Sequence, residues 1–295
     1  MLKRKFPHLC GRALQCAKCC VTWFLIPGKM AQKDMRFLCI FAVPRTGSSH
    51  LNKLLKSCPE FNAKSELFHR ARVGQFGKNE LAALARKSGG IATDAESLLP
   101  WRTQNPVSTL QALLSIKPNK ILTFKLFAGH LAREVIEEQF FSRDDMGFAI
   151  LRRRPIESFI SAVKAKAGET FRLADTTTLK PEIDAKAFVP WVRRVKDWYD
   201  WTAQSLQSRG HPFAELSFER HFDGLSAEDS LARVLEQIRR AGFPNITMPP
   251  NIITGERQDQ ERDYKARVAN WDAFEAAMRA DPENAKLLDW AEIAQ

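Results

Sequence analysis

The sequence lacks any long apolar run. The longest near its N-terminus, Val21 to Pro27, is far shorter than the ~20 residues that a membrane-spanning helix needs. We therefore expect no integral membrane segment. A basic start followed by a short apolar run imitates a secretory signal, but no small-residue cleavage site follows it cleanly, so export is not the expectation. Internal repeats and low-complexity tracts are also absent, which argues against a repeat architecture.

Cysteines are scarce beyond the first twenty residues. Four of the six lie within that stretch: Cys10, Cys16, Cys19 and Cys20. Of the other two, Cys39 is expected in a buried strand and Cys58 is expected to be unpaired, so a reducing, cytoplasmic location is the simpler interpretation. His8 and three of the early cysteines have the number and type of ligands for a zinc site. A disordered, reduced tail is the interpretation that we favour.

The composition is that of a globular protein with a basic balance. The 295 residues are 44% hydrophobic and 10% aromatic, which is enough for a sizeable core, and the net charge is +11. Residues 1–34 contribute seven basic side chains against Asp34 alone. We expect residues 1–34 to form a basic, disordered tail and residues 35–295 to form one domain. The charge suits nucleic acid, an anionic membrane or an anionic small ligand, and only a site can rank these.

Apolar, β-favouring runs alternate with helical patterns along the chain. Strands are expected at Arg36 to Val43, Lys120 to Phe127, Gly147 to Arg152 and Phe213 to Phe218, with a weaker candidate at Phe61 to Phe68. Helices are expected at Leu51 to Ser57, Asn79 to Lys87, Leu131 to Phe141, Pro155 to Lys166, Ala185 to Ser208, Ser226 to Ala241 and Trp271 to Ala280. Ser88 to Pro106 is expected to be a loop. This alternation predicts an α/β fold in three layers, with a mainly parallel sheet flanked by helices.

The segment from Pro44 to Ser49 has the form of an anion-binding loop. It follows the first expected strand and opens a helix, whose first N–H groups lack intrahelical acceptors. Gly47 permits close backbone approach, the serine hydroxyls add donors, and Arg45 adds a cation. The loop is not a Walker A motif, because the GxxxxGK[ST] pattern is missing, so ATP binding by that route is disfavoured.

This loop resembles the first motif of the sulfotransferases that use 3′-phosphoadenosine 5′-phosphosulfate (PAPS). That motif, P-[KR]-[ST]-G-[ST]-[ST], cradles the 5′-phosphosulfate in the family. The resemblance implies that one continuous run binds the cosubstrate: Arg45, Thr46, Gly47, Ser48, Ser49 and His50. Many members have Lys where this chain has Arg45, and Arg at this position is similar to several bacterial carbohydrate sulfotransferases.

A second segment is similar to the family's R-x-P-x-x-x-x-x-S signature, whose Arg and Ser bind the 3′-phosphate. Arg153 and Ser161 occupy the matching positions. Independently of the family, Arg153 ends an expected strand and Ser161 lies two turns into the next helix, so both face one crevice. The alternative is an exposed, charged strand end followed by an ordinary helix start.

A third, weaker resemblance lies near the C-terminus. The pair Arg257-Gln258 precedes Tyr264 and the run Arg267 to Trp271, and in bacterial sulfotransferases a similar pair closes over the nucleotide. A surface arginine and an N-cap at Asn270 are the alternatives. Together the resemblance spans roughly residues 36–271. It implies a P-loop-NTPase-like sulfotransferase fold, PAPS as cosubstrate with 3′,5′-ADP as product, and no metal.

Sulfuryl transfer needs a general base within reach of the acceptor hydroxyl. Glu66 is the first candidate, because Ser65 to His69 resembles the GExF segment of bacterial carbohydrate sulfotransferases, although Ser65 departs from the pattern. His69 and His130 are the alternatives. Arg45 is expected to act electrostatically, since Arg does not readily give up its proton. Lys125, unusual within a buried strand, is placed to reach the sulfonate or the acceptor.

The resemblance implies a carbohydrate or glycolipid acceptor and no nucleic-acid partner. Arg86, Arg102 and Arg172 lie in stretches expected to line the acceptor pocket, where they would favour an anionic acceptor; surface arginines are the alternative. Two other functions stay open. One is a nucleotide kinase or hydrolase of P-loop type, although no Asp follows the strand ending at Phe127 to hold Mg²⁺. The other is nucleic-acid binding through the basic tail.

Overall fold

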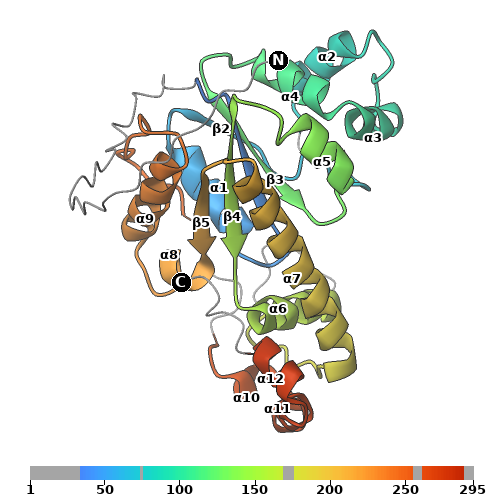
Figure 1. The fold of residues 1–295 in the computed structure, drawn as a ribbon, viewed down its shortest axis with the longest axis vertical. Coiled ribbons are helices and arrows are strands. Elements are labelled where there is room, and N and C mark those ends of the chain that lie inside the picture. Colours follow the sequence, from blue (N-terminus) through green and yellow to red (C-terminus); the bar gives the residue numbers. More distant parts are fainter. Residues whose placement is uncertain (1–33, 74–75, 169–175, 255–260, 289–295) are drawn as a thin grey trace, which may run out of the picture. The chain divides into compact units, whose positions relative to one another are not determined.

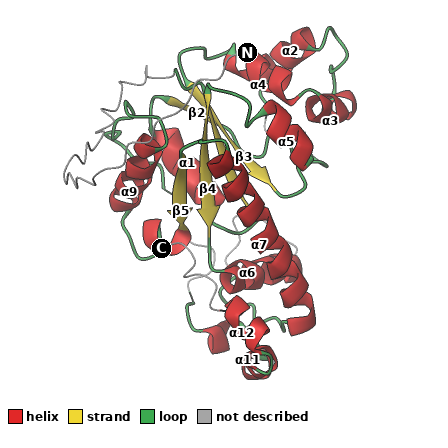
Figure 2. Cartoon of the chain, in the orientation of Figure 1, coloured by secondary structure: helices red, strands yellow, loops and turns green. Residues whose placement is uncertain are grey.

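The computed structural model describes residues 34–73, 76–168, 176–254 and 261–288. Within them a five-stranded, entirely parallel sheet has the order β2-β3-β1-β4-β5 (Figures 1 and 2). Its strands are β1 (Phe37–Ala42), β2 (Phe61–Ala63), β3 (Ile121–Phe127), β4 (Met146–Arg152) and β5 (Phe213–Ser217). The predicted α/β class with a parallel sheet is confirmed.

The central strand shows why the sheet is covered on both faces. All six residues of β1 are buried, and alternate side chains point to opposite faces. Phe37, Cys39 and Phe41 belong to one hydrophobic cluster, whereas Leu38 and Ile40 belong to another. Because neither face of the strand meets water, its sequence is continuously apolar rather than alternating.

Helices form the two outer layers. α1 (Ser48–Ser57) and α9 (Ala227–Arg240) contribute leucines to the cluster on one face. α5 (Arg133–Gln139), α6 (Pro155–Ala167) and α7 (Ala185–Ser208) contribute to the cluster on the other. The remaining described helices are α2 (Lys78–Lys87), α3 (Ala95–Gln104), α4 (Pro106–Leu114), α8 (Phe218–His221), α10 (Tyr264–Arg267), α11 (Trp271–Arg279) and α12 (Pro282–Leu288). No helix in these described ranges is long and apolar enough to span a bilayer.

The strand order brings three loops together at the carboxyl edge of the sheet. The chain leaves β1 for β2 and β3 on one side and then crosses to β4 and β5 on the other. β1 is therefore flanked by β3 and β4, at the kind of switch point where α/β proteins bind ligands. The side chains of α7 hold this edge: Trp198 Nε1 donates to the Ala42 carbonyl at 3.2 Å, and the Tyr199 hydroxyl donates to the Leu151 carbonyl at 2.8 Å.

Three local predictions are wrong. The expected loop from Ser88 to Pro106 contains α3 and the start of α4. Asp94 caps α3 by accepting from the Ser97 backbone N–H at 2.8 Å, and Pro106 opens α4 at a position where its missing N–H costs nothing. The apolar residues of α3 follow no clear helical stripe, so periodicity did not reveal it.

The expected strand from Phe61 to Phe68 ends at Ala63, because a turn between Ser65 and His69 follows. Phe218 opens α8 rather than closing β5.

Both cysteines in the described part of the chain, Cys39 and Cys58, are buried and unpaired as expected. The early cysteines, His8 and the basic tail lie outside the described residues. The division into a tail (1–34) and one domain (35–295) therefore stays a prediction.

Candidate functional site

The β1–α1 loop, residues 43–47, forms a tight turn at the carboxyl end of the central strand. Arg45 has φ 71° and Gly47 has φ 84°, both in the left-handed region. Among the described residues other than glycine, Arg45 alone has a positive φ, a strained conformation that clusters at functional sites. The Thr46 hydroxyl donates to the Val43 carbonyl at 2.8 Å and closes the turn. The first N–H groups of α1 consequently face the loop without intrahelical acceptors.

Arg45 joins this loop to the predicted second motif. Its Nε donates to Ser161 Oγ on α6 at 2.9 Å, and its carbonyl accepts from Arg153 Nη1 at 3.1 Å. These residues lie 116 and 108 positions apart in the chain. The structure therefore brings together Arg45, Arg153 and Ser161, which the sequence analysis assigned to two separate motifs. Burial and the neighbouring Arg153 both lower the pKa of Arg45, as two adjacent cations require.

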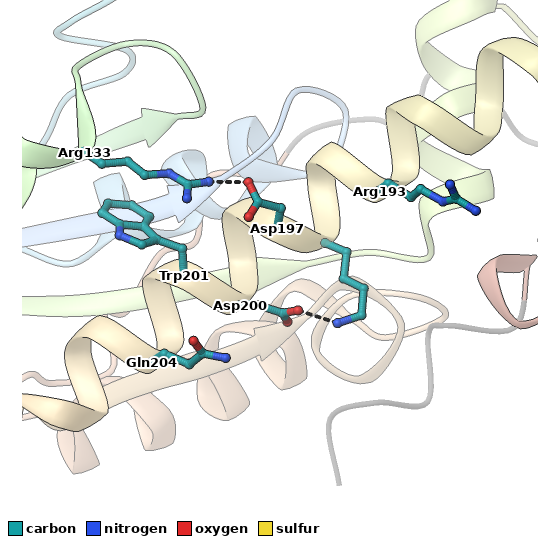
Figure 3. A pocket seen from close by; sticks show the side chains of 7 residues that line it. Arg133, Arg193, Asp197, Asp200, Trp201 and Gln204 are labelled. Carbon is teal, nitrogen blue, oxygen red and sulfur yellow. Dashed lines mark hydrogen bonds and ion pairs between the residues drawn. The ribbon is translucent and has the colours of Figure 1, made fainter. Parts of the chain in front are cut away.

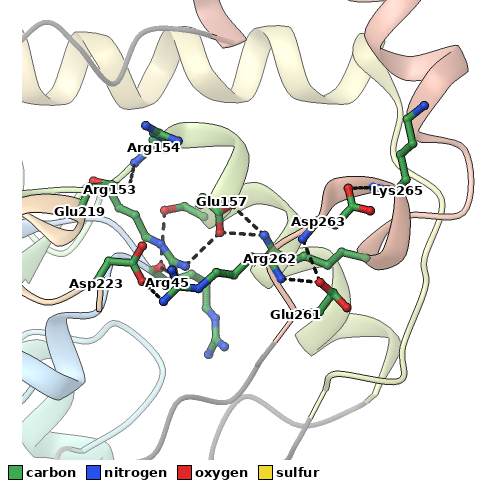
Figure 4. A network of polar contacts seen from close by, with 12 residues as sticks. Arg45, Arg153, Arg154, Glu157, Glu219, Asp223, Glu261, Arg262, Asp263 and Lys265 are labelled. Carbon is green, nitrogen blue, oxygen red and sulfur yellow. Dashed lines mark hydrogen bonds and ion pairs between the residues drawn. The ribbon is translucent and has the colours of Figure 1, made fainter. Parts of the chain in front are cut away.

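Glu157 ties the arginines together. Its carboxylate accepts from Arg153 Nη2 at 3.1 Å and from Arg267 Nη1 at 2.8 and 2.9 Å (Figure 4 shows Glu157 beside Arg153). Arg267 is only 1% exposed. Burial by itself would raise the pKa of Glu157, but the two arginines and hydrogen bonds from Arg267 and Tyr264 outweigh it and lower that pKa. We call Arg45, Arg153, Glu157, Ser161 and Arg267 the arginine cluster.

Phe218 is a structural support that the sequence analysis missed. The guanidinium of Arg153 lies over its ring, 4.2 Å from the centroid. A Cβ added to Gly47 would lie 2.5 Å from Phe218 Cδ2, so glycine is required by contact as well as by φ. Phe218 thus contacts both the β1–α1 loop and the end of β4. The only signal in the sequence was an aromatic residue at the end of an expected strand.

A second group of polar residues lies on the other side of the loop, at the end of β3. Lys125 is 1% exposed, and its Nζ lies 3.5 Å from Ser48 Oγ, 3.4 Å from Ser49 Oγ and 3.6 Å from Glu66 Oε1. Glu66 is held there because the Lys125 backbone N–H donates to the Ser65 carbonyl at 3.1 Å. A cation, a carboxylate and two hydroxyls therefore meet at the N-terminus of α1.

The two candidate histidines lie beside each other, with ring centroids 5.8 Å apart. His69 Nδ1 accepts from the Ala71 N–H at 3.1 Å, and His130 Nδ1 accepts from the Phe127 N–H at 3.2 Å. A neutral ring that accepts at Nδ1 carries its proton on Nε2, so both side chains are donors. Burial, followed by the charges of His69, Arg102, Lys125 and Arg70, lowers the pKa of His130 to about 3.

Arg102 of α3 completes this group. Its side chain is fully buried, and Nη2 donates to the carbonyls of His69 and Arg72. Burial lowers its pKa to about 10, so it stays cationic at neutral pH. We call Glu66, His69, Arg102, Lys125 and His130 the histidine cluster. Of the other arginines expected near an acceptor, Arg86 is exposed on α2, and Arg172 lies outside the described residues.

The remaining predicted residues are more dispersed. The His50 ring packs edge-on against Phe222 with centroids 5.3 Å apart, and burial lowers the pKa of His50. Asn270 stands at the N-cap of α11, but its side chain bonds the Ile183 backbone at 2.9 and 3.0 Å instead. Arg257 and Gln258 lie outside the described residues, so their predicted closure over a nucleotide stays a prediction.

A pocket between α5 and α7 is separate from both clusters (Figure 3). Its lining is Arg133, Arg193, Lys196, Asp197, Asp200, Trp201 and Gln204. Arg133 pairs with Asp197, and Lys196 pairs with Asp200. Because these charges satisfy one another, the pocket does not single out a ligand.

Comparison with known proteins finds distant similarity among solved structures only. No family model matches the chain, and no curated protein matches its sequence. Among solved structures, a sulfotransferase domain from the curacin biosynthetic pathway aligns with a TM-score of 0.42 and 13% identity, covering 88% of this chain and 93% of that one. The similarity is too distant to assign a function, so the residues of the site must carry that argument.

Proposed function

We propose that this protein is a sulfotransferase that moves the sulfuryl group of PAPS to a hydroxyl of a carbohydrate or glycolipid and releases 3′,5′-ADP. One observation carries the proposal. Arg45 of the β1–α1 loop contacts Ser161 at 2.9 Å, and its carbonyl accepts from Arg153, so two motifs over 100 residues apart meet at one sheet edge. Both motifs are the ones that resemble the phosphate-binding segments of this family.

The donors in the two places fit a ligand with two separated anionic groups. At the β1–α1 loop, the first N–H groups of α1, the hydroxyls of Ser48 and Ser49 and the Lys125 ammonium face one point. At the arginine cluster, Arg45, Arg153 and Ser161 offer cationic and hydroxyl donors. We assign the first place to the 5′-phosphosulfate and the second to the 3′-phosphate.

The chain's own residues then divide the chemistry. When bound, PAPS supplies an activated sulfuryl group. We assign Glu66 as the base that takes the acceptor's proton while the acceptor oxygen bonds to sulfur and the bond from sulfur to the phosphate oxygen breaks. Lys125 and the α1 N–H groups stabilise charge on the leaving oxygen. His69 and His130 suit this role less well, because each already accepts a backbone N–H at Nδ1.

A thermal-shift titration with 3′,5′-ADP tests the donor site. A ligand at 100 times its Kd stabilises the folded state by about 2.7 kcal/mol, which corresponds to roughly 5 °C or more in a domain of this size. We expect that shift with 3′,5′-ADP and a much smaller one with 5′-ADP or Mg-ATP. Arg153→Ala should abolish it, whereas Arg240→Ala, which removes an exposed arginine of α9, should not.

The other outcomes separate the alternatives. Stabilisation by Mg-ATP instead of 3′,5′-ADP would indicate a kinase or hydrolase of P-loop type. Salt-sensitive binding of nucleic acid that disappears on deleting residues 1–34 would indicate a nucleic-acid-binding protein. A folded sample with no selective shift from 3′,5′-ADP would contradict the sulfotransferase proposal.

A further inference from the structure

Arg102 is a buried cation whose donors are only partly used. Its side chain has no exposed surface, and its hydrogen bonds within the described part of the chain run from Nη2, to the carbonyls of His69 and Arg72. Nε and Nη1 are buried without a hydrogen-bond partner, and no carboxylate of the described residues forms an ion pair with Arg102. Buried donors left unbonded cost free energy, and a buried charge costs more when no opposite charge compensates it. An anion at this place would remove both costs.

The neighbouring histidines add donors of the same kind. The backbone N–H groups of Ala71 and Phe127 occupy Nδ1 of His69 and His130, so each neutral ring has its remaining N–H at Nε2. The rings lie 5.8 Å apart. Two ring N–H groups beside a buried guanidinium form a set of donors that no side-chain acceptor of the described residues uses.

The surroundings are strongly electropositive. Besides burial, the cations Arg102, Lys125 and Arg70 and the neighbouring His69 lower the pKa of His130, and none of these groups is acidic. Glu66 is the one carboxylate of the histidine cluster, and it faces Lys125 at 3.6 Å. A region with this balance attracts anions and repels cations.

The same residues lie next to the place of transfer. Lys125 belongs to the histidine cluster and also contacts Ser48 and Ser49 at the N-terminus of α1. An acceptor whose hydroxyl reaches Glu66 would therefore extend toward His69, His130 and Arg102. This step rests on the proposed function, which places the sulfuryl group at that N-terminus.

We propose that the acceptor carries an oxyanion, in the form of a carboxylate, sulfate or phosphate, close to the hydroxyl that receives the sulfuryl group. The oxyanion accepts from Nε2 of His69 and His130 and lies against the guanidinium of Arg102. Arg102 thereby selects an anionic over a neutral acceptor. It acts as a specificity-determining residue, while Glu66 and Lys125 serve the transfer itself.

Matched sugars test this selection on the full chain. Binding is measured calorimetrically with saturating 3′,5′-ADP for methyl glucoside, methyl glucuronide, glucose 6-sulfate and glucose 6-phosphate. We expect at least one anionic sugar to bind roughly 10- to 100-fold more tightly than the glucoside, as hydrogen bonds to a charged group allow. The strongest of the three identifies the oxyanion. Equal binding of the neutral and all anionic sugars would overturn the proposal.

Variants show whether the preference arises at this cluster. Arg102→Met should remove it and Arg102→Lys should retain part of it, whereas Arg240→Met, which changes an exposed arginine of α9, should leave it unchanged. His130→Asn keeps an acceptor for the Phe127 N–H but loses the outward donor, and His130→Gln keeps the donor. We expect His130→Asn to weaken binding of the anionic sugars and His130→Gln to leave it unchanged. A preference for anionic sugars that survives both Arg102→Met and His130→Asn would overturn the assignment. If Arg102→Met does not fold, the comparison of His130→Asn with His130→Gln tests the assignment instead.

Ring nitrogen NMR provides a measurement that a purely structural role would not affect. Both histidines should carry the proton on Nε2 in the unliganded protein, and both Nε2 signals should shift when the preferred anionic sugar is added. A proton on Nδ1, or signals that do not move, would contradict the proposed donors.

The two proposals fail in different ways. The 3′,5′-ADP shift is recorded first, without sugar. A normal nucleotide shift with no anion preference overturns the acceptor assignment alone. Absence of the nucleotide shift overturns the proposed function, and the acceptor assignment with it.

Discussion

The arginine cluster and the histidine cluster flank the same loop but treat charge in opposite ways. In the arginine cluster, Glu157 bridges Arg153 and Arg267 with contacts between 2.8 and 3.1 Å. In the histidine cluster, Lys125 makes contacts of 3.4 to 3.6 Å, and Arg102 has buried donors that no acceptor in the described part of the chain meets. The cations of the arginine cluster are therefore compensated by a carboxylate within the cluster, whereas part of the donors of the histidine cluster is not used by the described residues.

We infer that the arginine cluster fixes the position of a bound anion, whereas the histidine cluster makes binding depend on whether the ligand carries a charge. Fixed, compensated cations keep their geometry before any ligand arrives, so they cost little reorganisation when an anion binds. Uncompensated donors lower stability until an anion completes them, and this makes binding selective for charge. We therefore expect substitutions in the arginine cluster to lower stability as well as nucleotide binding, and those in the histidine cluster to affect mainly activity and specificity.

The largest expected effect is the loss of Glu157. Glu157→Ala leaves Arg267, which is 1% exposed, without its carboxylate, and breaking such a buried pair costs about 3–5 kcal/mol. Urea denaturation measures this loss as a drop in the free energy of unfolding. Glu236→Ala removes the exposed partner of Arg240 and should change stability by less than about 1 kcal/mol. Equal effects of the two substitutions would remove the contrast between the clusters.

Lys125→Met should have the opposite balance of effects, with a large loss of activity and a small change in stability. Met has a similar length and no charge to bury, and Glu66, the partner left behind, is 26% exposed and stays in contact with water, so the free energy of unfolding is expected to fall by less than for Glu157→Ala. Removing the cation near the leaving group should lower the rate of transfer by about 10²–10³-fold. Sulfuryl transfer from PAPS and urea denaturation are measured on the same preparation. A variant that unfolds easily but still transfers at the normal rate would contradict the assignment of Lys125.

Gly47→Ala tests the contact between the β1–α1 loop and Phe218. Its φ of 84° strains any other residue by about 1–2 kcal/mol, and contact with Phe218 adds about 1–3 kcal/mol. Gly89→Ala provides the control, since Gly89 has φ 66° but nothing lies within 4 Å of its added Cβ. We expect Gly47→Ala to be the more destabilising of the two in thermal denaturation. In the double variant Gly47→Ala with Phe218→Ala, the destabilisation caused by the contact should disappear, and the destabilisation caused by the positive φ should remain.

The pH dependence of stability gives the most local test, because it follows the protonation of one side chain. His130 has a pKa of about 3 in the folded protein, against about 6.5 when unfolded, so between these values the unfolded state binds the extra proton. The free energy of unfolding should therefore fall by about 1.4 kcal/mol per pH unit as pH drops from about 6.5 toward 3. His130→Gln should reduce the slope in that window. An unchanged slope would show that His130 is not buried in its neutral form.

The fold was largely predictable because its signals are local. The residues of β1 are apolar throughout since both faces are covered, and α7 was predicted with the bounds that the structure has, Ala185–Ser208. The missed helix, α3, depends on its capping by Asp94 and on contacts of its few apolar residues rather than on a periodic stripe. Its existence follows from the tertiary structure more than from its own sequence.

In the candidate site, the residues of the two motifs were predictable from the sequence, but the ion pair that joins Glu157 to Arg267 was not. The loop containing Gly47 and the pair Arg153 and Ser161 form compact patterns, and the expectation that Arg153 and Ser161 face one crevice agrees with the contact between Arg45 and Ser161. The bridge from Glu157 to Arg267 joins residues 110 positions apart. No spacing rule in one sequence points to such a pair.

The sequence by itself determined the order of the five strands and of the main helices between them, the conformational need for glycine in the β1–α1 loop, and the places where cations follow strands. These depend on residues within a few positions of each other. Only the tertiary structure decided which charges are compensated, because the cost of a buried charge depends on every group packed around it. That is why Arg102 and Arg267, both with about 1% exposure or less, differ: among the described residues, Arg267 pairs with a carboxylate, whereas Arg102 donates to backbone carbonyls.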